Sequence, residues 1–290
     1  MCASEDASSS NTASELLANP RFDLIPFEGF NAALSHLPPA ADIAITLAPE
    51  LGVERTVERA EEAASHGYSV LPHIAPRFIH DESELEDIAV RLHTAGVTAI
   101  FVPGGDRAEP IGDYRSAYEM LVALEDLGQE FAEVGITGYP EGHHEIPDDV
   151  IWNETRKKMP FADFFVTQMC FDPIRIIDWV RTTRSKGFDI PVEVGIPGVV
   201  TYTRLMKMAW RYGIARPIQF VQKTTGLRGF LTELILARGK YRPDELIETL
   251  VSSGADVSHA IGQLRLYTFN ETAQTESWRL GQLEGHSSIR

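Results

Sequence analysis

Residues 135–172 decide the fold, and they read GITGYPEGHHEIPDDVIWNETRKKMPFADFFVTQMCFD. The segment begins with an apolar run that predicts a strand, followed by a polar loop that gathers Tyr, Glu and His residues. A helix with a cluster of basic residues comes next, and a second apolar strand ends on Gln168. Polar groups thus follow two successive strands, which is where α/β folds place their binding and catalytic groups.

The alternation of strand and helix extends to both sides of this segment. Apolar runs predict strands at residues 23–28, 42–47, 68–74, 98–103, 133–138, 164–169, 191–196 and 263–269. Helical spacing of apolar residues predicts helices at 52–65, 81–95, 113–127, 148–159, 173–186, 201–212, 227–238 and 243–252.

Repeated strand–helix units imply parallel strands that are joined by right-handed crossovers. We therefore expect a single-domain (β/α)8 TIM barrel over residues 21–290, preceded by a flexible N-terminal tail at residues 1–20. An open doubly wound sheet is the alternative. The first strand is not followed by the G-x-G-x-x-G motif of a dinucleotide-binding fold, which favours the barrel.

The chain has 290 residues, 43% of them hydrophobic, and a formal net charge of -16 at pH 7. So acidic a chain is not expected to bind nucleic acid or an anionic membrane, since both require a basic surface. Its two cysteines give no disulfide framework, and no apolar run reaches the roughly 18 residues of a membrane span. No signal-peptide pattern begins the chain, so we expect a cytoplasmic protein, and we expect no regulatory domain after the last strand.

Polar residues follow almost every predicted strand, and in a barrel these strand ends share one mouth. They include Glu28, Thr46, His73, Gly104, Gly105, Asp106, Tyr139, His143, Gln168 and Tyr267. We therefore expect a ligand site there. Glu28 follows an apolar run, which favours a raised pKa and a general acid, although an ion pair at the rim is equally compatible. Asp106 follows two glycines, which suit either close approach to a heterocycle or simply a tight turn.

Two further groups leave alternatives open. His73, His143 and His144 with nearby glutamates suggest a metal, but their spacing matches no standard zinc pattern, so an organic ligand is favoured. Asn153, Arg156 and Lys157 share one helix face, which suits either a phosphate group or a solvated basic surface.

Taken together, these residues resemble the methylenetetrahydrofolate reductase family. The anchors occur in the family's order over about residues 23 to 275, and they are Phe27-Glu28, Pro72-His73-Ile74, Gly105-Asp106, Gly138-Tyr139-Pro140-Glu141-Gly142-His143, Arg156-Lys157, Thr167-Gln168, Phe171-Asp172, Gly195-Ile196-Pro197 and Leu266-Tyr267-Thr268-Phe269-Asn270.

The resemblance implies a barrel that holds FAD non-covalently at the strand ends. In the family, NADH or NADPH reduces the flavin, and methylenetetrahydrofolate then takes the same place and receives a hydride from flavin N5. By position, Glu28 is the implied general acid for opening the folate's five-membered ring, and Asp106 lies near flavin and pterin. The other implied contacts are Thr46, His73, Gly104, Gly105, Tyr139, His143, Asn153, Arg156 and Lys157 for FAD, and Gln168, Arg204, Met208 and Tyr267 for folate or nicotinamide.

The chain departs from the family pattern at several positions. Gly104 stands where the family usually has Arg, Arg204 and Met208 stand where it has Gln and Phe, and Glu271 replaces an Arg. These departures suggest a divergent member that prefers another electron donor or oxidises methyltetrahydrofolate. A folate-binding or one-carbon transferase barrel and a flavin-independent reductase are the alternatives. A tetrahydrofolate is the expected partner, and a homo-oligomer is compatible with the sequence.

Overall fold

A computed structural model describes residues 13–143, 145–201 and 240–287. Its centre is an eight-stranded parallel sheet in the order β3-β2-β1-β10-β7-β6-β5-β4. The strands are β1 (Arg21–Leu24), β2 (Asp42–Ile45), β3 (Ser69–Pro72), β4 (Ala99–Val102), β5 (Glu133–Gly138), β6 (Phe164–Thr167), β7 (Val192–Pro197) and β10 (Ile261–Tyr267).

The two outer strands of this order, β3 and β4, meet and close the sheet. His73 directly follows β3 and forms a parallel bridge with Phe101 of β4. The backbone N–H of Ile74 donates to the Phe101 carbonyl at 2.9 Å. The predicted (β/α)8 barrel is therefore confirmed.

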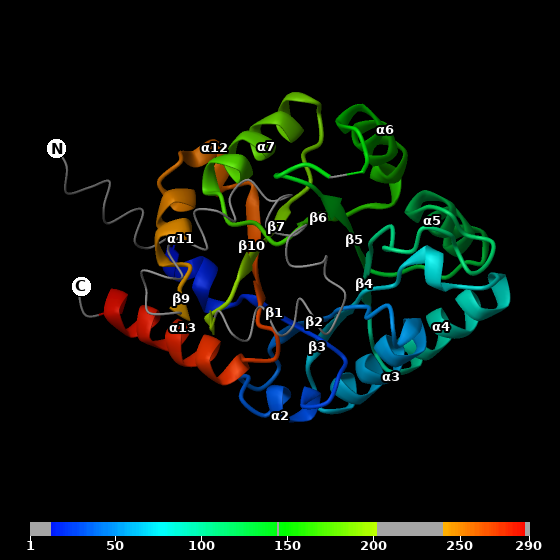
Figure 1. Ribbon diagram of the computed structural model, residues 1–290, viewed down its shortest axis with the longest axis horizontal. Helices are drawn as coiled ribbons and strands as arrows, with labels where there is room; N and C mark the ends of the chain where they lie inside the picture. Colours follow the sequence, from blue (N-terminus) through cyan, green and yellow to red (C-terminus); the bar gives the residue numbers. More distant parts are fainter. Residues whose placement is uncertain (1–12, 144, 202–239, 288–290) are drawn as a thin grey trace.

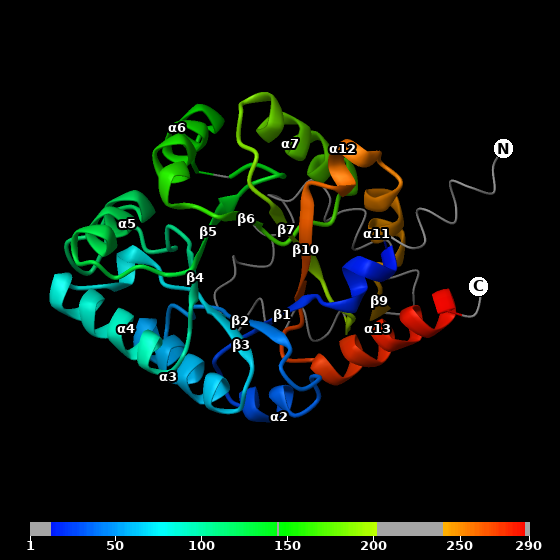
Figure 2. The ribbon, with the colours of Figure 1, turned by 180° about the vertical axis from the view of Figure 1, so that it is seen from behind.

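Helices surround the strands as an outer ring in both views (Figure 1, Figure 2). They are α2 (Phe30–Leu34), α3 (Gly52–Ser65), α4 (Glu82–Thr94), α5 (Ala117–Asp126), α6 (Asp148–Lys158), α7 (Pro173–Ser185), α11 (Asp244–Val251), α12 (Ala255–Ser258) and α13 (Thr272–Ser287). The remaining elements are the 3-10 turns η1 (Pro76–Phe78) and η2 (Met159–Phe161) and the antiparallel pair β8 (Val200–Thr201) and β9 (Lys240–Tyr241).

Local sequence signals fix where several helices begin. Ser116 and Glu119 form a capping box at the start of α5. The Ser116 side chain accepts a hydrogen bond from the Glu119 backbone N–H, and the Glu119 side chain accepts one from the Ser116 backbone N–H. The Asp172 side chain accepts from the backbone of Ile174 at 2.9 Å, and Pro173 occupies the first helical position of α7. These caps end the loops that leave β4 and β6 at defined points.

Strand alternation separates two apolar regions. On β2, Ile43 and Ile45 belong to the main core between sheet and helices, whereas Ala44 belongs to a separate inner cluster. That inner cluster consists of Ala44, Leu71, Phe101, Phe164 and Val166. It fills one side of the barrel interior, and the opposite side, lined by β1, β7 and β10, carries charged groups.

Residues 13–20 do not have the flexible character that was predicted for residues 1–20. Residues 13–18 are helical, and Ala13, Leu16 and Leu17 are buried in the main core. Arg279 of α13 donates from Nη1 to the carbonyl oxygens of Leu17 and Ala18 at 2.8 and 3.0 Å. Residues 13–20 therefore belong to the folded domain. The helix predicted at 201–212 lies outside the described residues from residue 202 onward, and so does the whole helix predicted at 227–238.

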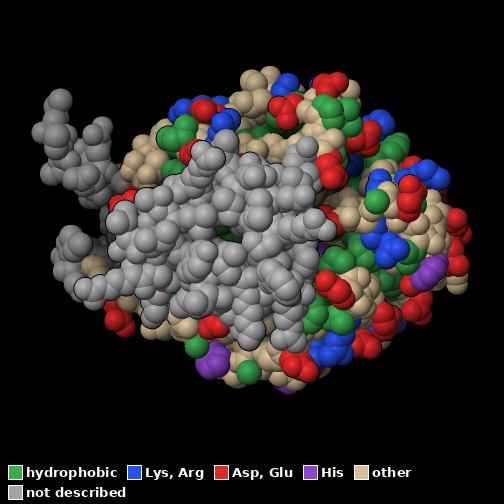
Figure 3. Space-filling view, in the orientation of Figure 1, with side chains coloured by type: hydrophobic (Ala, Val, Ile, Leu, Met, Phe, Trp, Pro, Cys, Tyr) green, Lys and Arg blue, Asp and Glu red, His purple; other side chains and the backbone are tan. Residues whose placement is uncertain are grey.

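The visible surface mixes acidic and basic side chains over the outer helices on the right of the view, beyond the grey region (Figure 3). Within the described residues, no helix has the length and apolar character needed to cross a membrane.

Candidate functional site

A buried carboxylate on β1 is the centre of the charged half of the barrel. Asp23 is 2% exposed, and its Oδ1 accepts a hydrogen bond from the Thr46 hydroxyl at 2.6 Å. Its Oδ2 accepts from Arg265 Nε at 3.0 Å. Because β1 lies between β2 and β10, side chains from both sides of β1 reach Asp23 inside the barrel.

Arg265 lies at the centre of this group and is fully buried. Its guanidinium carbon is 5.2 Å from the centroid of the Phe101 ring and 6.0 Å from that of Tyr267. Its Nε is 3.5 Å from Glu193 Oε1, and Glu193 Oε2 accepts a hydrogen bond from Arg21 Nε at 3.1 Å. Two cations and two carboxyl groups thus balance each other, as buried charges require.

His73 joins the group through a contact that fixes its protonation. Its Nε2 is 2.8 Å from Arg265 Nη2. A guanidinium has only donors, so Nε2 accepts this hydrogen bond and the ring proton resides on Nδ1. Burial, followed by the charge of Arg265, lowers the pKa of His73 well below its ordinary value, so the ring is neutral.

Asp23 has the opposite behaviour. Burial raises the pKa of its carboxyl group to about 6, and the charge of Arg265 and the hydrogen bond from Thr46 limit the increase. A carboxyl group that titrates near neutrality is suited to donate or accept a proton during a reaction. Among the described residues, Asp23 thus has a pKa that suits proton transfer near neutral pH.

The carboxyl end of β1 is held in place by the segment that follows β10. Asn270 accepts a hydrogen bond from Ile25 N at 2.9 Å and donates from Nδ2 to Ile25 O at 3.0 Å. Thr268 donates from Oγ1 to the Asp23 carbonyl at 2.7 Å. Asn270 has a φ of 61°, a left-handed conformation that Asn tolerates better than most residues. These bonds fix the backbone beside the Asp23 carboxyl group.

A second polar group follows β5. Tyr139 is half-buried, and its ring contacts that of His143 edge-on at 5.3 Å between centroids. Burial raises the pKa of the Tyr139 hydroxyl, a hydrogen bond from Thr137 opposes this, and nearby Asp106 adds to it. His143 Nδ1 accepts from the backbone N–H groups of Glu145 and Ile146, both at 3.2 Å. The structure therefore brings Asp106, Tyr139 and His143 together at the mouth.

Glu141 connects this loop to the loop after β6. Its Oε1 accepts from the backbone N–H groups of Phe171 and Asp172 at 3.1 and 3.3 Å. Its Oε2 is buried and has no hydrogen-bond partner among the described residues. Burial raises the pKa of this carboxyl group, and the two backbone bonds lower it. Glu141 thereby links the loop after β5 to the loop after β6.

Glu28 does not occupy the apolar environment that was one of the two alternatives for it. The strand was predicted to run to residue 28, but β1 ends at Leu24 and Glu28 lies in an exposed turn before α2. Pro26 has no N–H for a strand ladder, and Asn270 takes the backbone groups of Ile25, so the strand cannot continue.

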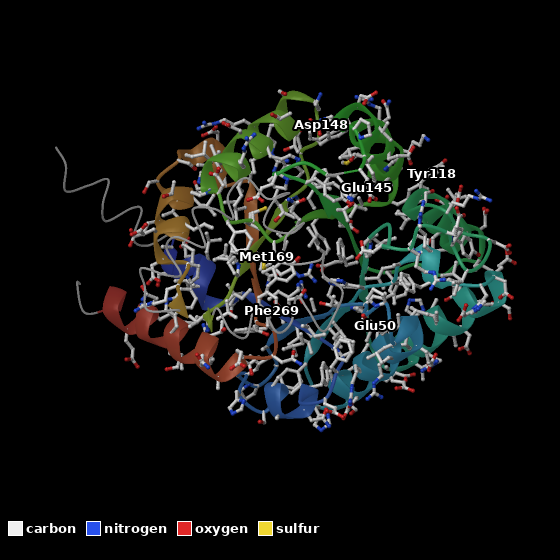
Figure 4. The ribbon with its side chains drawn as sticks, in the orientation of Figure 1. Glu50, Tyr118, Glu145, Asp148, Met169 and Phe269 are labelled. Atoms are coloured by element: carbon white, nitrogen blue, oxygen red, sulfur yellow. The ribbon has the colours of Figure 1, made fainter. Side chains whose placement is uncertain are left out.

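The basic helix face is also exposed. Asn153, Arg156 and Lys157 are all solvent-accessible on α6. Lys157 Nζ is 2.7 Å from Glu154 and 5.9 Å from the centroid of the Tyr118 ring. Tyr118 lies in the outer helical ring, whereas Met169 lies nearer the centre of the barrel (Figure 4). These contacts leave both alternatives open, a phosphate contact and a solvated surface, and the Lys157–Glu154 pair favours the second.

The remaining predicted residues lie at the mouth or outside the described part. Gly104 and Gly105 are half-buried after β4, and Gln168 is half-buried after β6. Tyr267 donates to the Thr167 carbonyl at 3.4 Å, and Gly195 leaves the space that its ring occupies. Arg204 and Met208 lie outside the described residues. No cluster of three or more His, Cys, Asp or Glu side chains that would suit a metal occurs in the described part of the chain.

Sequence reasoning missed Asp23, Glu193 and Arg265, although a signal was present. Each is a charged residue between two apolar ones in a predicted buried strand, as in Phe22-Asp23-Leu24 and Leu264-Arg265-Leu266. With period-two alternation, the apolar neighbours face the helices and the charge faces the barrel interior. Opposite charges on different strands would then have indicated an internal ion cluster.

Comparison with known proteins adds a family assignment. The family model described as methylenetetrahydrofolate reductase matches residues 53–277. Methylenetetrahydrofolate reductase 2 of Saccharomyces cerevisiae is 30% identical over 164 residues, covering 55% of this chain and 26% of that protein. Methylenetetrahydrofolate reductase 1 of Schizosaccharomyces pombe is 29% identical over 203 residues, covering 65% of this chain and 32% of that protein. The match therefore spans about a quarter to a third of the length of these relatives.

Among solved structures, a putative lyase/mutase from Burkholderia cenocepacia J2315 matches with a TM-score of 0.46 at 14% identity, covering 99% of this chain and 90% of that one.

Proposed function

Because the chain belongs to the methylenetetrahydrofolate reductase family, we propose that it interconverts 5,10-methylenetetrahydrofolate and 5-methyltetrahydrofolate with FAD as hydride carrier. The observation that carries the proposal is the buried Asp23 carboxyl group, with a pKa of about 6, at the carboxyl end of β1. A folate ring that must open and close needs such a proton donor in a site that excludes water.

The residues at the mouth fit a flavin ring. Tyr139 and His143 offer half-buried aromatic edges, and neutral His73 offers an N–H donor. A Cβ at Gly104 would meet no described atom within 4 Å, so the described residues leave the backbone there open to a flat heterocycle. Bound FAD would supply a hydride acceptor and donor between NADH or NADPH and the folate.

Asp23 meets the physical requirements of the acid better than Glu28 does. In the reductive direction, the acid gives its proton to the ring nitrogen whose C–N bond breaks, and the folate becomes an iminium ion that accepts hydride. A proton donor with a pKa near 6 is protonated for part of the time at neutral pH. Exposed Glu28 is the alternative proton donor, and substitution of each residue in turn distinguishes between the two.

The test combines a spectrum with turnover. Purified protein is given excess FAD and desalted, and retention of a flavin band at about 450 nm supports the cofactor. We expect Asp23→Asn to lower turnover by at least about 100-fold with flavin retained, and Glu28→Gln to lower it by less than about 3-fold. The reverse pattern would assign the acid to Glu28, and the absence of any flavin band would reject the FAD proposal.

A flavin-independent reductase is the second candidate. The observation that favours it is the exposure of Asn153, Arg156 and Lys157, with Lys157 already paired with Glu154. A colourless protein that still transfers hydride directly from NADH or NADPH to methylenetetrahydrofolate would establish it.

A further inference from the structure

Arg265 in the barrel interior contacts a neutral side chain, His73, as well as the carboxyl groups that balance its charge. Arg265 donates Nε to Asp23 at 3.0 Å and Nη2 to His73 at 2.8 Å, from a position with no solvent exposure. Its third nitrogen, Nη1, is buried and has no hydrogen-bond partner among the described residues. A guanidinium is a rigid planar fork, so one side chain sets the directions of both neighbours at once.

We propose that Arg265 is the positioning residue of this site, because its guanidinium holds His73 as the neutral Nδ1–H tautomer and fixes the Asp23 carboxyl group against Thr46. His73 then has one ring donor, Nδ1–H, and no acceptor left for a ligand. A neutral donor suits an uncharged acceptor atom, such as a ring nitrogen or carbonyl oxygen of a heterocycle, rather than a phosphate. The statement that His73 Nδ1–H binds a heterocycle, called the ligand clause below, rests on the proposed function. The assignment of the tautomer does not.

The arrangement of the neighbours excludes the other tautomer while Arg265 is present. His73 Nε2 also lies 3.7 Å from Asp23 Oδ2, so a proton on Nε2 would face the carboxylate if the arginine were absent. With Arg265 in place, that proton would point at a donor instead. The Phe101 ring lies edge-on to His73 at 4.7 Å between centroids and restricts its rotation. The other charged groups of the cluster, Arg21 and Glu193, contact each other or Arg265.

The test is the protonation state of the His73 ring, observed by long-range proton–nitrogen NMR of protein with labelled histidine. Comparison with His73→Gln assigns the ring among the nine histidines, and His36→Gln, which removes an exposed ring, is the assignment control. We expect wild-type His73 to carry its proton on Nδ1 and to keep that pattern between about pH 5.5 and 8.5. A proton on Nε2, or a doubly protonated ring in this range, would overturn the proposal.

Two variants separate a positioning role from a structural one. Arg265→Met removes the donors, and we expect the His73 proton to move to Nε2, facing Asp23. Arg21→Met is the matched control, because Arg21 is a buried arginine of the same cluster that does not contact His73, and we expect the tautomer to stay unchanged. An unchanged tautomer in Arg265→Met would overturn the proposal. If Arg265→Met does not fold, the wild-type spectrum still decides.

The ligand clause has its own readout. Titration of the protein with FAD, followed by flavin fluorescence, should give an affinity about 10-fold lower in Arg265→Met than in wild type, as for one misdirected hydrogen bond. Equal affinities would overturn the clause. If wild type binds no FAD, the proposed function fails together with the clause, and the NMR result on Arg265 stands independently.

Discussion

The titration of Asp23 gives the most quantitative prediction for stability. Burial raises the pKa of this carboxyl group from 3.8 to about 6 in the folded protein. At 1.36 kcal/mol per pKa unit, this corresponds to about 3 kcal/mol of linkage between protonation and folding. The folded state holds the proton more tightly than the unfolded chain, so Asp23 stabilises the fold at low pH. That contribution is fully present below about pH 3.8 and is lost as the pH rises through about 6.

Asp23→Asn removes the titration while keeping the shape and an oxygen for Thr46. The free energy of unfolding is measured by urea denaturation of wild type and variant at a series of pH values. From about pH 4.5 to 7.5, we expect wild type to lose about 2 kcal/mol relative to the variant. Glu86→Gln, which changes an exposed carboxylate on α4, is the control for general acid effects. A wild-type-minus-variant difference that stays constant with pH would refute the account of a buried, proton-binding Asp23.

Three further predictions concern packing and loop geometry. Gly195→Ala should destabilise the fold by about 1–3 kcal/mol in urea denaturation, because a Cβ there would lie 2.7 Å from the Tyr267 ring. Gly281→Ala, in an open position on α13, should instead be neutral or stabilising by about 0.5–1 kcal/mol, and equal effects of the two changes would contradict the packing described. Glu141→Ala should lower the free energy of unfolding by about 1–3 kcal/mol and weaken FAD binding. Glu141→Gln keeps an acceptor oxygen and should have a smaller effect. Identical behaviour of the two variants would argue against the connection between the loops. Removal of residues 1–20 should destabilise the protein by about 3–5 kcal/mol more than removal of residues 1–12, since buried Leu16 and Leu17 are lost only in the longer deletion. Equal stability of the two deletion variants in thermal or urea unfolding would contradict the burial of these leucines.

The architecture was predictable because strand and helix have different periods. The strand at residues 133–138 and the helix at residues 52–65 were predicted with the bounds that the structure has. Parallel order followed from alternation alone, since strands joined by helices must run in the same direction.

The first strand shows where local patterns fail. The apolar run Leu24-Ile25-Pro26-Phe27 suggested a strand to Glu28, but the end of β1 is set by Asn270, which is distant in sequence. Helix α2 was missed because it has only five residues, too few to show a helical period. Residues 13–18 have a polar, serine-rich sequence before them, and their burial depends on α13 at the other end of the chain.

The site was predicted in part. The grouping of Asp106, Tyr139 and His143 follows from their positions after β4 and β5, and the structure brings them together. The cluster of Asp23, His73 and Arg265 depends on which strands are neighbours in the closed barrel, because β1 and β10 come from opposite ends of the chain. The apolar neighbours of Asp23 in the sequence indicate that its side chain faces the barrel interior, but the burial that raises its pKa is completed by side chains from other strands.

Under the proposed function, this barrel exchanges hydride between a flavin and a folate. The most direct test is an anaerobic half-reaction, in which FAD-loaded protein is mixed with 5-methyltetrahydrofolate and no other electron donor. We expect the flavin absorbance at about 450 nm to be lost and to return on addition of excess methylenetetrahydrofolate. A flavin that is bleached by NADH or NADPH but is unaffected by either folate would contradict the claim.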